Sequence, residues 1–171
     1  AHDGNAGASV LDDMRSLWVE AADLVSGESV WIPYELVHTD YRRPAEPGSG
    51  FFLCSSNGLA SGNTFDEAVV HGACEVIERD ANALWNRLTP EQRAMTGVDP
   101  DSISHSECRG LLERYEAAAV DVAIWEMTTD IGLPAFYCQI HGRRQDDSHS
   151  GAGAGCHLTR DVAMLRALTE A

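Results

Sequence analysis

The chain has 171 residues, the length of one ordinary domain, and 44% of them are hydrophobic. That apolar fraction supports a packed core and excludes a wholly disordered chain. Twelve Lys and Arg residues against 27 Asp and Glu residues give a formal net charge of −15. This charge argues against binding to nucleic acid or to an anionic membrane surface, because both need a basic face on the protein. The excess carboxylates either solvate the surface or hold a cation.

The cysteines indicate a reduced protein. They are scattered along the chain, with no CxxC pair, at Cys54, Cys74, Cys108, Cys138 and Cys156. This spacing argues against a zinc ribbon or a thioredoxin-type motif, and the odd number is typical of free thiols. No apolar run approaches the roughly 18 residues that would span a bilayer. We therefore expect a cytoplasmic protein.

The first third of the chain is predicted to be loosely organised. Residues 1–10 show no periodicity and are expected to form a flexible lead. Residues 11–25 place apolar side chains near helical spacing, although the later part of that segment could equally be extended. Residues 30–37 are rich in β-forming side chains, and their proline favours an edge strand. Residues 51–54 form a short apolar strand candidate.

Residues 55–64, SSNGLASGNT, are too rich in small and turn-forming residues for a regular element. Thr64 and Glu67 then form a capping-box pattern, which predicts a helix from Thr64 to about Leu88. Its buried face is supplied by residues such as Phe65, Val69 and Ile77. The following residues, 89–105, are predicted to be a linker with one helical turn.

The last third alternates between strands and helices. A helix is predicted over 107–119, and two strands over 120–127 and 133–141 form a hairpin around the turn at Asp130–Gly132. Residues 142–156 are predicted to be a flexible loop because of their glycines, serines and aspartates. A third helix starts at Thr159 or Asp161. Together these elements predict an α+β fold in which a mixed or antiparallel sheet packs against helices.

One face of the helix predicted after Thr64 carries polar groups at helical spacing. His71, Glu75, Glu78 and Asn82 follow one another at intervals of four, three and four residues, so they share a stripe. Two glutamates this close repel each other unless they are hydrated or share a cation, and magnesium suits sparse oxygen ligands. Arg79 beside them could pair with an acid or reach a phosphate. A solvated helix face explains the same spacing, and both interpretations stay open.

Two glycine-rich segments each lead into a predicted helix. Such a turn presents free N–H groups to an anion, yet residues 55–64 match neither the Walker A motif nor GxGxxG. A tight connection packed on the sheet is the alternative. Residues 151–170 follow a similar plan, with His157 at the junction and Glu170 on the helix. This similarity is compatible with two arms of one site.

The two segments together resemble the signatures of the YcaO family. They are SNGLASGNTFDEAVVHGACEVIERDA at residues 56–81 and GAGAGCHLTRDVAMLRALTEA at residues 151–171. The resemblance implies a YcaO-type fold that binds ATP and Mg²⁺ and phosphorylates a backbone amide of a ribosomal peptide or protein substrate. The product would be an azoline, or a thioamide when a TfuA-like partner takes part. Bacteriocin biosynthesis and modification of a ribosomal protein are among the roles that the resemblance implies.

Residue by residue, the resemblance assigns Glu75 and Glu78 to a metal-binding pair and Glu170 to a second metal-binding helix. It places His71 at a nucleotide contact. Residues 11–171 are expected to be a partial YcaO domain, truncated at both ends, that folds but catalyses poorly by itself. Exposed apolar surface would then favour a homo-oligomer. A non-catalytic scaffold or pseudoenzyme that binds a leader peptide or partner is the alternative function.

Overall fold

The computed structural model describes residues 16–42, 50–143 and 150–171. The chain divides after Leu59 into two compact units. The flexible lead predicted for residues 1–10 lies outside the described residues. Within the described ranges, no helix is long and apolar enough to cross a membrane.

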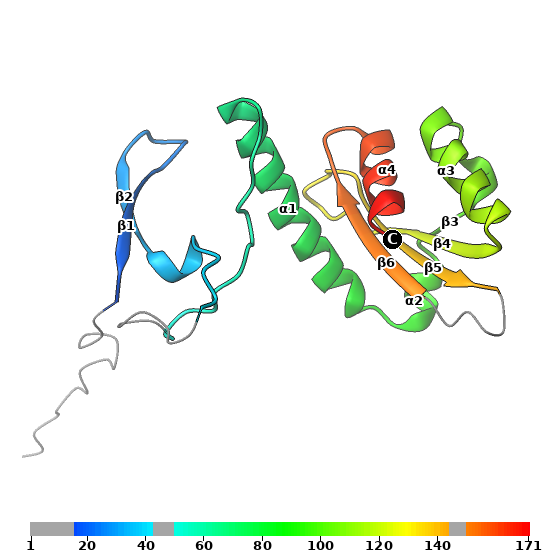
Figure 1. Cartoon of the computed structure of the whole chain (residues 1–171), viewed down its shortest axis with the longest axis horizontal. Helices are drawn as coiled ribbons and strands as arrows, with labels where there is room; N and C mark the ends of the chain where they lie inside the picture. Colours follow the sequence, from blue (N-terminus) through cyan, green and yellow to red (C-terminus); the bar gives the residue numbers. More distant parts are fainter. Residues whose placement is uncertain (1–15, 43–49, 144–149) are drawn as a thin grey trace, which may run out of the picture. The chain divides into compact units, whose positions relative to one another are not determined.

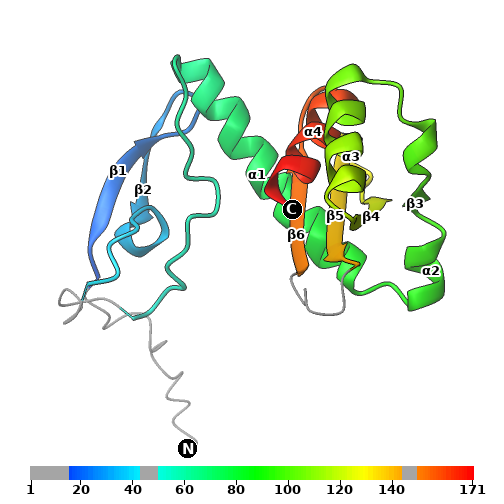
Figure 2. The same ribbon diagram turned by 45° about the vertical axis from the view of Figure 1, so that its right-hand side comes forward.

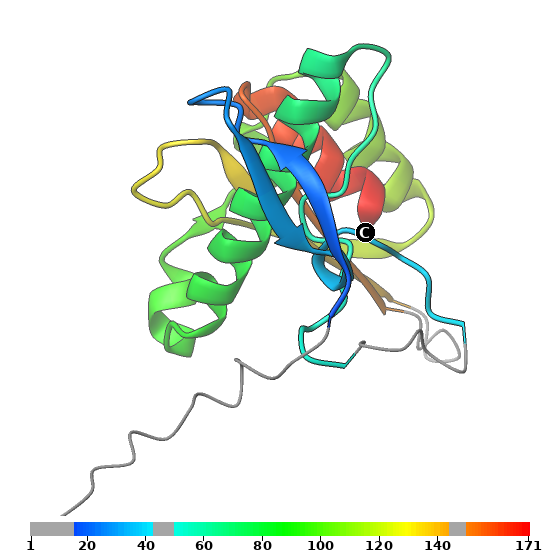
Figure 3. The same ribbon diagram turned by 90° about the vertical axis from the view of Figure 1, so that its left-hand side faces the viewer.

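The first unit is built on a two-stranded hairpin (Figure 3). Strand β1 (Trp18–Ala22) pairs antiparallel with β2 (Ser29–Pro33), and a 3₁₀ turn, η2 (Tyr34–Leu36), follows. The helix predicted over residues 11–25 is therefore wrong in its described part, and the extended alternative is right. The reason is the turn after β1, where the Asp23 carboxylate accepts the N–H groups of Val25 and Ser26 and reverses the chain.

A buried carboxylate organises the rest of the first unit. Glu35 is 5% exposed, and it accepts the backbone N–H groups of Gly50, Phe51 and Phe52. These bonds lower the pKa of Glu35 because they favour its charged form, and the bond from Gly50 has the largest effect. The strand predicted over residues 51–54 is absent there, because Glu35 instead takes up N–H groups that a strand would have paired.

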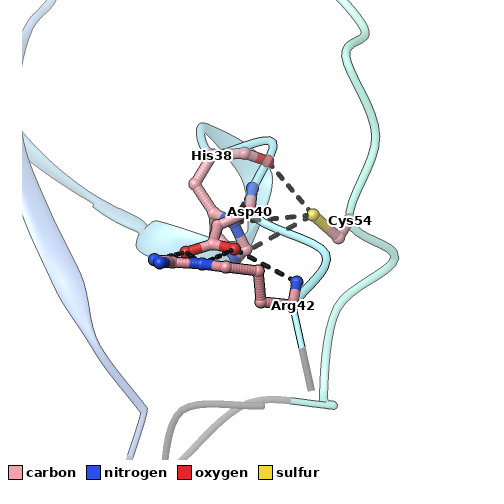
Figure 4. Close-up of polar contacts among 4 residues, drawn as sticks. All are labelled: His38, Asp40, Arg42 and Cys54. Atoms are coloured by element: carbon pink, nitrogen blue, oxygen red, sulfur yellow. Dashed lines mark hydrogen bonds and ion pairs between the residues drawn. The ribbon is translucent and has the colours of Figure 1, made fainter. Parts of the chain in front are cut away.

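A polar cluster lies beside this loop (Figure 4). The Cys54 thiol donates to the carbonyl oxygen of His38 at 3.1 Å, and the His38 Nδ1 accepts the N–H of Asp40 at 3.0 Å. The Arg42 guanidinium lowers the pKa of Asp40 to about 2. The cluster ties the segment after η2 to the segment around Cys54.

The second unit contains a four-stranded antiparallel sheet (Figure 1). Its order is β3 (Gly97–Val98), β4 (Val120–Glu126), β5 (Ala135–Gly142) and β6 (Ser150–Cys156). In the register, Ile124 of β4 lies opposite Cys138 of β5, and Ala135 lies opposite Cys156. The predicted hairpin of residues 120–127 and 133–141 is confirmed, whereas β3 lies in the predicted linker.

Strand β6 corrects the prediction of a flexible loop over residues 142–156, because it occupies residues 150–156 as a regular strand. Its glycines are needed for close packing on α4 (Arg160–Glu170). A Cβ atom at Gly153 would lie 2.5 Å from the Ala171 nitrogen and 2.6 Å from the Ala167 oxygen. Glycine here marks a close approach of two backbones rather than a turn.

Helices cover both faces of the sheet (Figure 2). On one face, α3 (Ser106–Ala117) and α4 pack on Ile124 and Phe136. On the other, α1 (Phe65–Asn86) packs on Met127 and Ala135. The short helices α2 (Pro90–Ala94) and η3 (Pro100–Ser102) connect α1 to α3. The three predicted helices and the α+β class are confirmed.

Candidate functional site

The loop before α1 is held tightly against the helix. Thr64 caps α1, since its hydroxyl accepts the Glu67 N–H at 3.2 Å. The Glu67 carboxylate accepts the N–H of Asn63 at 2.7 Å. In an ideal capping box it would accept the N–H of the cap residue itself, one position later. A Cβ atom at Gly62 would lie 2.5 Å from the Ala68 nitrogen, so only glycine allows the loop to cross here.

Glu78 of α1 reaches the outer edge of the sheet. Its Oε2 accepts the N–H of Cys156 at 3.0 Å, at the end of β6. Burial raises the pKa of Glu78, and the negative charge of Glu170 on α4 raises it further, while Arg166 acts in the opposite direction. Two of the predicted metal ligands therefore interact, although they come from helices on opposite faces of the sheet.

His71 lies on the same side of α1, two turns before Glu78. Its Nδ1 is 3.1 Å from the carbonyl oxygen of Ser61, and its Nε2 is 3.4 Å from Nη2 of Arg166. A hollow of about 460 Å³ opens beside them. It is lined by Asp66, Glu67, Val70, His71, Cys74, His157 and Arg166.

Arg166 was missed by the sequence reasoning. It lies four residues before Glu170, so both point from the same side of α4. The signal that could have revealed it is this spacing, which repeats on α4 the pattern of charged residues one turn apart on α1. Arg166 matters because its charge acts on Glu78 and its guanidinium lies 3.4 Å from His71.

Glu75 forms an ion pair within its own helix. Its Oε1 accepts from Arg79 at 2.8 Å, one turn along the same helix. Asn82, the last member of the stripe, accepts from Asn86 at 2.7 Å. Across the described ranges of the chain, no group of three or more His, Cys, Asp or Glu side chains gathers as a complete metal site.

The chemistry of these donors nevertheless fits a magnesium ion that retains other oxygen ligands. Burial first and the charge of Glu170 second raise the pKa of Glu78, and a divalent cation beside the two carboxylates would offset both effects. Magnesium commonly takes one or two carboxylates and completes its shell with water and phosphate oxygens. Arg166, which lines the hollow, provides a guanidinium group for those phosphates.

Comparison with known proteins gives this arrangement a context. Residues 1–171 match the YcaO family, described as a YcaO cyclodehydratase that binds ATP and Mg²⁺. An uncharacterized protein in the tfuA 3′ region of Rhizobium leguminosarum bv. trifolii is 42% identical over 160 residues. That match covers 90% of this chain and 37% of the relative, so the chain spans little more than a third of the relative's length.

Solved structures share the fold. A heterocyclase in complex with substrate and cofactor is 33% identical with a TM-score of 0.75, over 90% of this chain and 20% of that protein. The YcaO protein of Methanopyrus kandleri bound with AMPPCP and Mg²⁺ is 25% identical with a TM-score of 0.64, over 90% and 38%. Because the family model matches the chain along its whole length, the chain belongs to the YcaO family.

Proposed function

We propose that the protein uses ATP and Mg²⁺ to activate a backbone amide of a peptide or protein. The observation that supports this most directly is the electrostatic interaction of Glu78 with Glu170 and Arg166, together with the position of Arg166 in the hollow next to His71. Carboxylates for a metal and a guanidinium for phosphate are what a triphosphate site needs. The membership in the YcaO family supports the same chemistry.

The roles of the side chains follow from their surroundings. Glu78 and Glu170 would hold the magnesium ion, which offsets charge on the transferred phosphoryl group. Arg166 and His71 would bind phosphate oxygens from the side of the hollow, and the 2.8 Å pair of Glu75 with Arg79 would open if Glu75 joins the metal. The Oε2 of Glu78 is engaged by Cys156, so its Oε1 is the oxygen left for a cation.

The product class and the partners are part of the proposal. Addition of a Cys, Ser or Thr side chain to the activated amide gives an azoline, and addition of sulfide gives a thioamide. The relative in the tfuA 3′ region favours a TfuA-like partner and a thioamide product. A similar heterocyclase is solved in complex with substrate and cofactor, which supports a site that binds both together. A cytoplasmic location suits a protein whose described cysteines are all free.

Binding of ATP in the presence of magnesium tests the proposal. Glu78→Gln and Arg166→Gln should each weaken magnesium-dependent ATP binding by tenfold or more, because each removes a charge that faces the triphosphate. Glu107→Gln, an exposed glutamate at the start of α3, is the matched control and should leave binding unchanged. Release of ADP or AMP with candidate peptides provides the activity measurement. Turnover that is unaffected by Glu78→Gln would refute the assignment.

A further inference from the structure

The sheet has a second edge, formed by β3 and β4, that is only partly paired. Strand β3 contributes two residues, Gly97 and Val98, which lie opposite Trp125 and Ile124. After Val98 the chain turns into η3, whose first residue, Pro100, has no N–H to donate. Among the described residues, no strand continues alongside the first half of β4.

The direction of the hydrogen bonds identifies which groups this edge exposes. The Arg143 N–H bonds to the carbonyl of Ala119, and the Met127 N–H bonds to the carbonyl of Ala135, so odd-numbered residues of β4 face β5. The even-numbered residues face the other way, as shown by the Glu126 N–H, which bonds to Thr96. The backbone groups of Val120 and Val122 therefore point out of the sheet.

These two valines line a hollow of about 570 Å³ between β4 and α3. Leu112 of α3 supplies a further apolar wall. The rim is charged and consists of Asp101, Arg109, Glu113, Glu116, Asp121 and Arg143. An apolar floor beside unpaired strand groups is the arrangement into which an extended peptide inserts as an added strand.

The charges of the rim select the kind of peptide. Four carboxylates face two guanidinium groups, and Arg143 is already engaged by Glu116 and Asp121. Arg109 lies 3.8 Å from Asp101. Glu113 has no ion-pair partner among the described residues, so its charge is available to a ligand. The groove is acidic overall, in a chain with a net charge of −15.

From the open edge, the hollow and the acidic rim, we infer that the first half of β4 docks an extended segment of a basic peptide. The segment pairs antiparallel with the first half of β4, as β3 does with the second half. Alternate side chains of the segment face α3, and among these an apolar side chain packs toward Leu112 while a Lys or Arg two residues away reaches Glu113. Two edge residues supply two N–H and two C=O groups to the pairing. The surface lies at the opposite edge of the sheet from Glu78, so it does not rest on the proposed function.

The probe is a peptide with valine and lysine at the alternate positions that face α3 and threonine at the positions between them. It is labelled with fluorescein, and fluorescence anisotropy measures its affinity for the purified protein. In the antiparallel pairing, the residues whose side chains face α3 also direct their backbone N–H toward Val120 and Val122. N-methylation of the valines and lysines should therefore weaken binding by tenfold or more, whereas N-methylation of the threonines should change it less than twofold. Equal weakening by both peptides, or no binding of the parent peptide, would overturn the inference.

Matched protein variants test the charge. Glu113→Lys should weaken binding about threefold to tenfold, and replacing the peptide lysines with glutamate should abolish it. Asp130→Lys, with the same charge change at the exposed turn at the other end of β4, should leave the affinity within about twofold. Circular dichroism checks that both variants fold. Self-association of the protein that the peptide cannot displace would show that a second copy covers this edge, and would also overturn the inference.

Discussion

The close packing of β6 on α4 makes Gly155 sensitive to a single methyl group. A Cβ atom at this position would lie 2.6 Å from the Ala167 nitrogen and 2.8 Å from the Arg166 Cβ, and closer still to the carbonyl oxygen of Ala163. Ordinary contacts between heavy atoms are about 3.5–4.0 Å, so α4 would have to move by about 1 Å. Most of these obstacles are backbone atoms, which cannot rotate away as the end of a side chain can.

Gly155→Ala is therefore expected to lower the free energy of unfolding by about 3 kcal/mol, at the upper end of the cost of overpacking. For a chain of this size, that corresponds to a decrease in Tm of about 10 °C. Urea and thermal denaturation followed by circular dichroism measure the loss. Because α4 carries Arg166 and Glu170, ATP binding should weaken in the same variant.

Gly110→Ala is the matched control for this substitution. Gly110 lies inside α3, and a Cβ atom there would meet no atom within 4 Å. Alanine in a helix interior is favoured over glycine by about 0.5–1 kcal/mol, so this variant should be slightly more stable than the wild type. A Gly155→Ala variant that melts within about 2 °C of the wild type would refute the packing argument.

Three further variants probe single interactions. Because the pKa of Glu78 is raised, the stability that this group contributes is complete at low pH and is lost as the pH rises through its folded-state pKa. Glu78→Gln should remove that loss. In urea denaturation without nucleotide or magnesium, the Gln variant should therefore be more stable than the wild type at pH 8 but not at pH 4. Thr64→Ala removes the cap of α1 and should cost about 1 kcal/mol in thermal denaturation, a cost that Thr64→Ser should largely avoid. Thr96→Val leaves the indole N–H of Trp85, 7% exposed, without its 3.0 Å acceptor and should cost about 1–3 kcal/mol, whereas Thr96→Ser should be close to the wild type; equal stability of the Val and Ser variants would contradict this.

Local signals were sufficient for the elements whose stability is local. Thr64 and Glu67 predict the start of α1, and the cap is observed at Thr64. The alternating residues of β4 and β5 and the turn between them predict the hairpin. In each case the residues that carry the signal also make the contacts, so a single sequence contains the information.

The elements that were missed depend on partners distant in the sequence. The glycines of β6 have the composition of a loop, and only the close approach of α4 explains why they form a strand. The predicted strand at residues 51–54 does not form, because the N–H groups of Phe51 and Phe52 donate to Glu35 instead. Glu35 lies sixteen residues before Phe51 and seventeen before Phe52. Of the predicted site residues, Glu78 interacts electrostatically with Glu170 and Arg166, and His71 lies beside Arg166. The pairing of Glu75 with Arg79 could not be distinguished from a shared metal by spacing alone.

The bond between Glu78 and Cys156 also occupies a backbone donor at an edge of the sheet. The N–H of Cys156 points out of β6, the last strand of the sheet, where an unpaired edge would be a template for another strand. A negatively charged side chain occupies that position and repels an approaching carbonyl oxygen. A substitution such as Glu78→Ala would therefore damage more than the candidate site, because it would expose a strand edge made mostly of glycine and alanine and leave it open to β-strand addition between molecules.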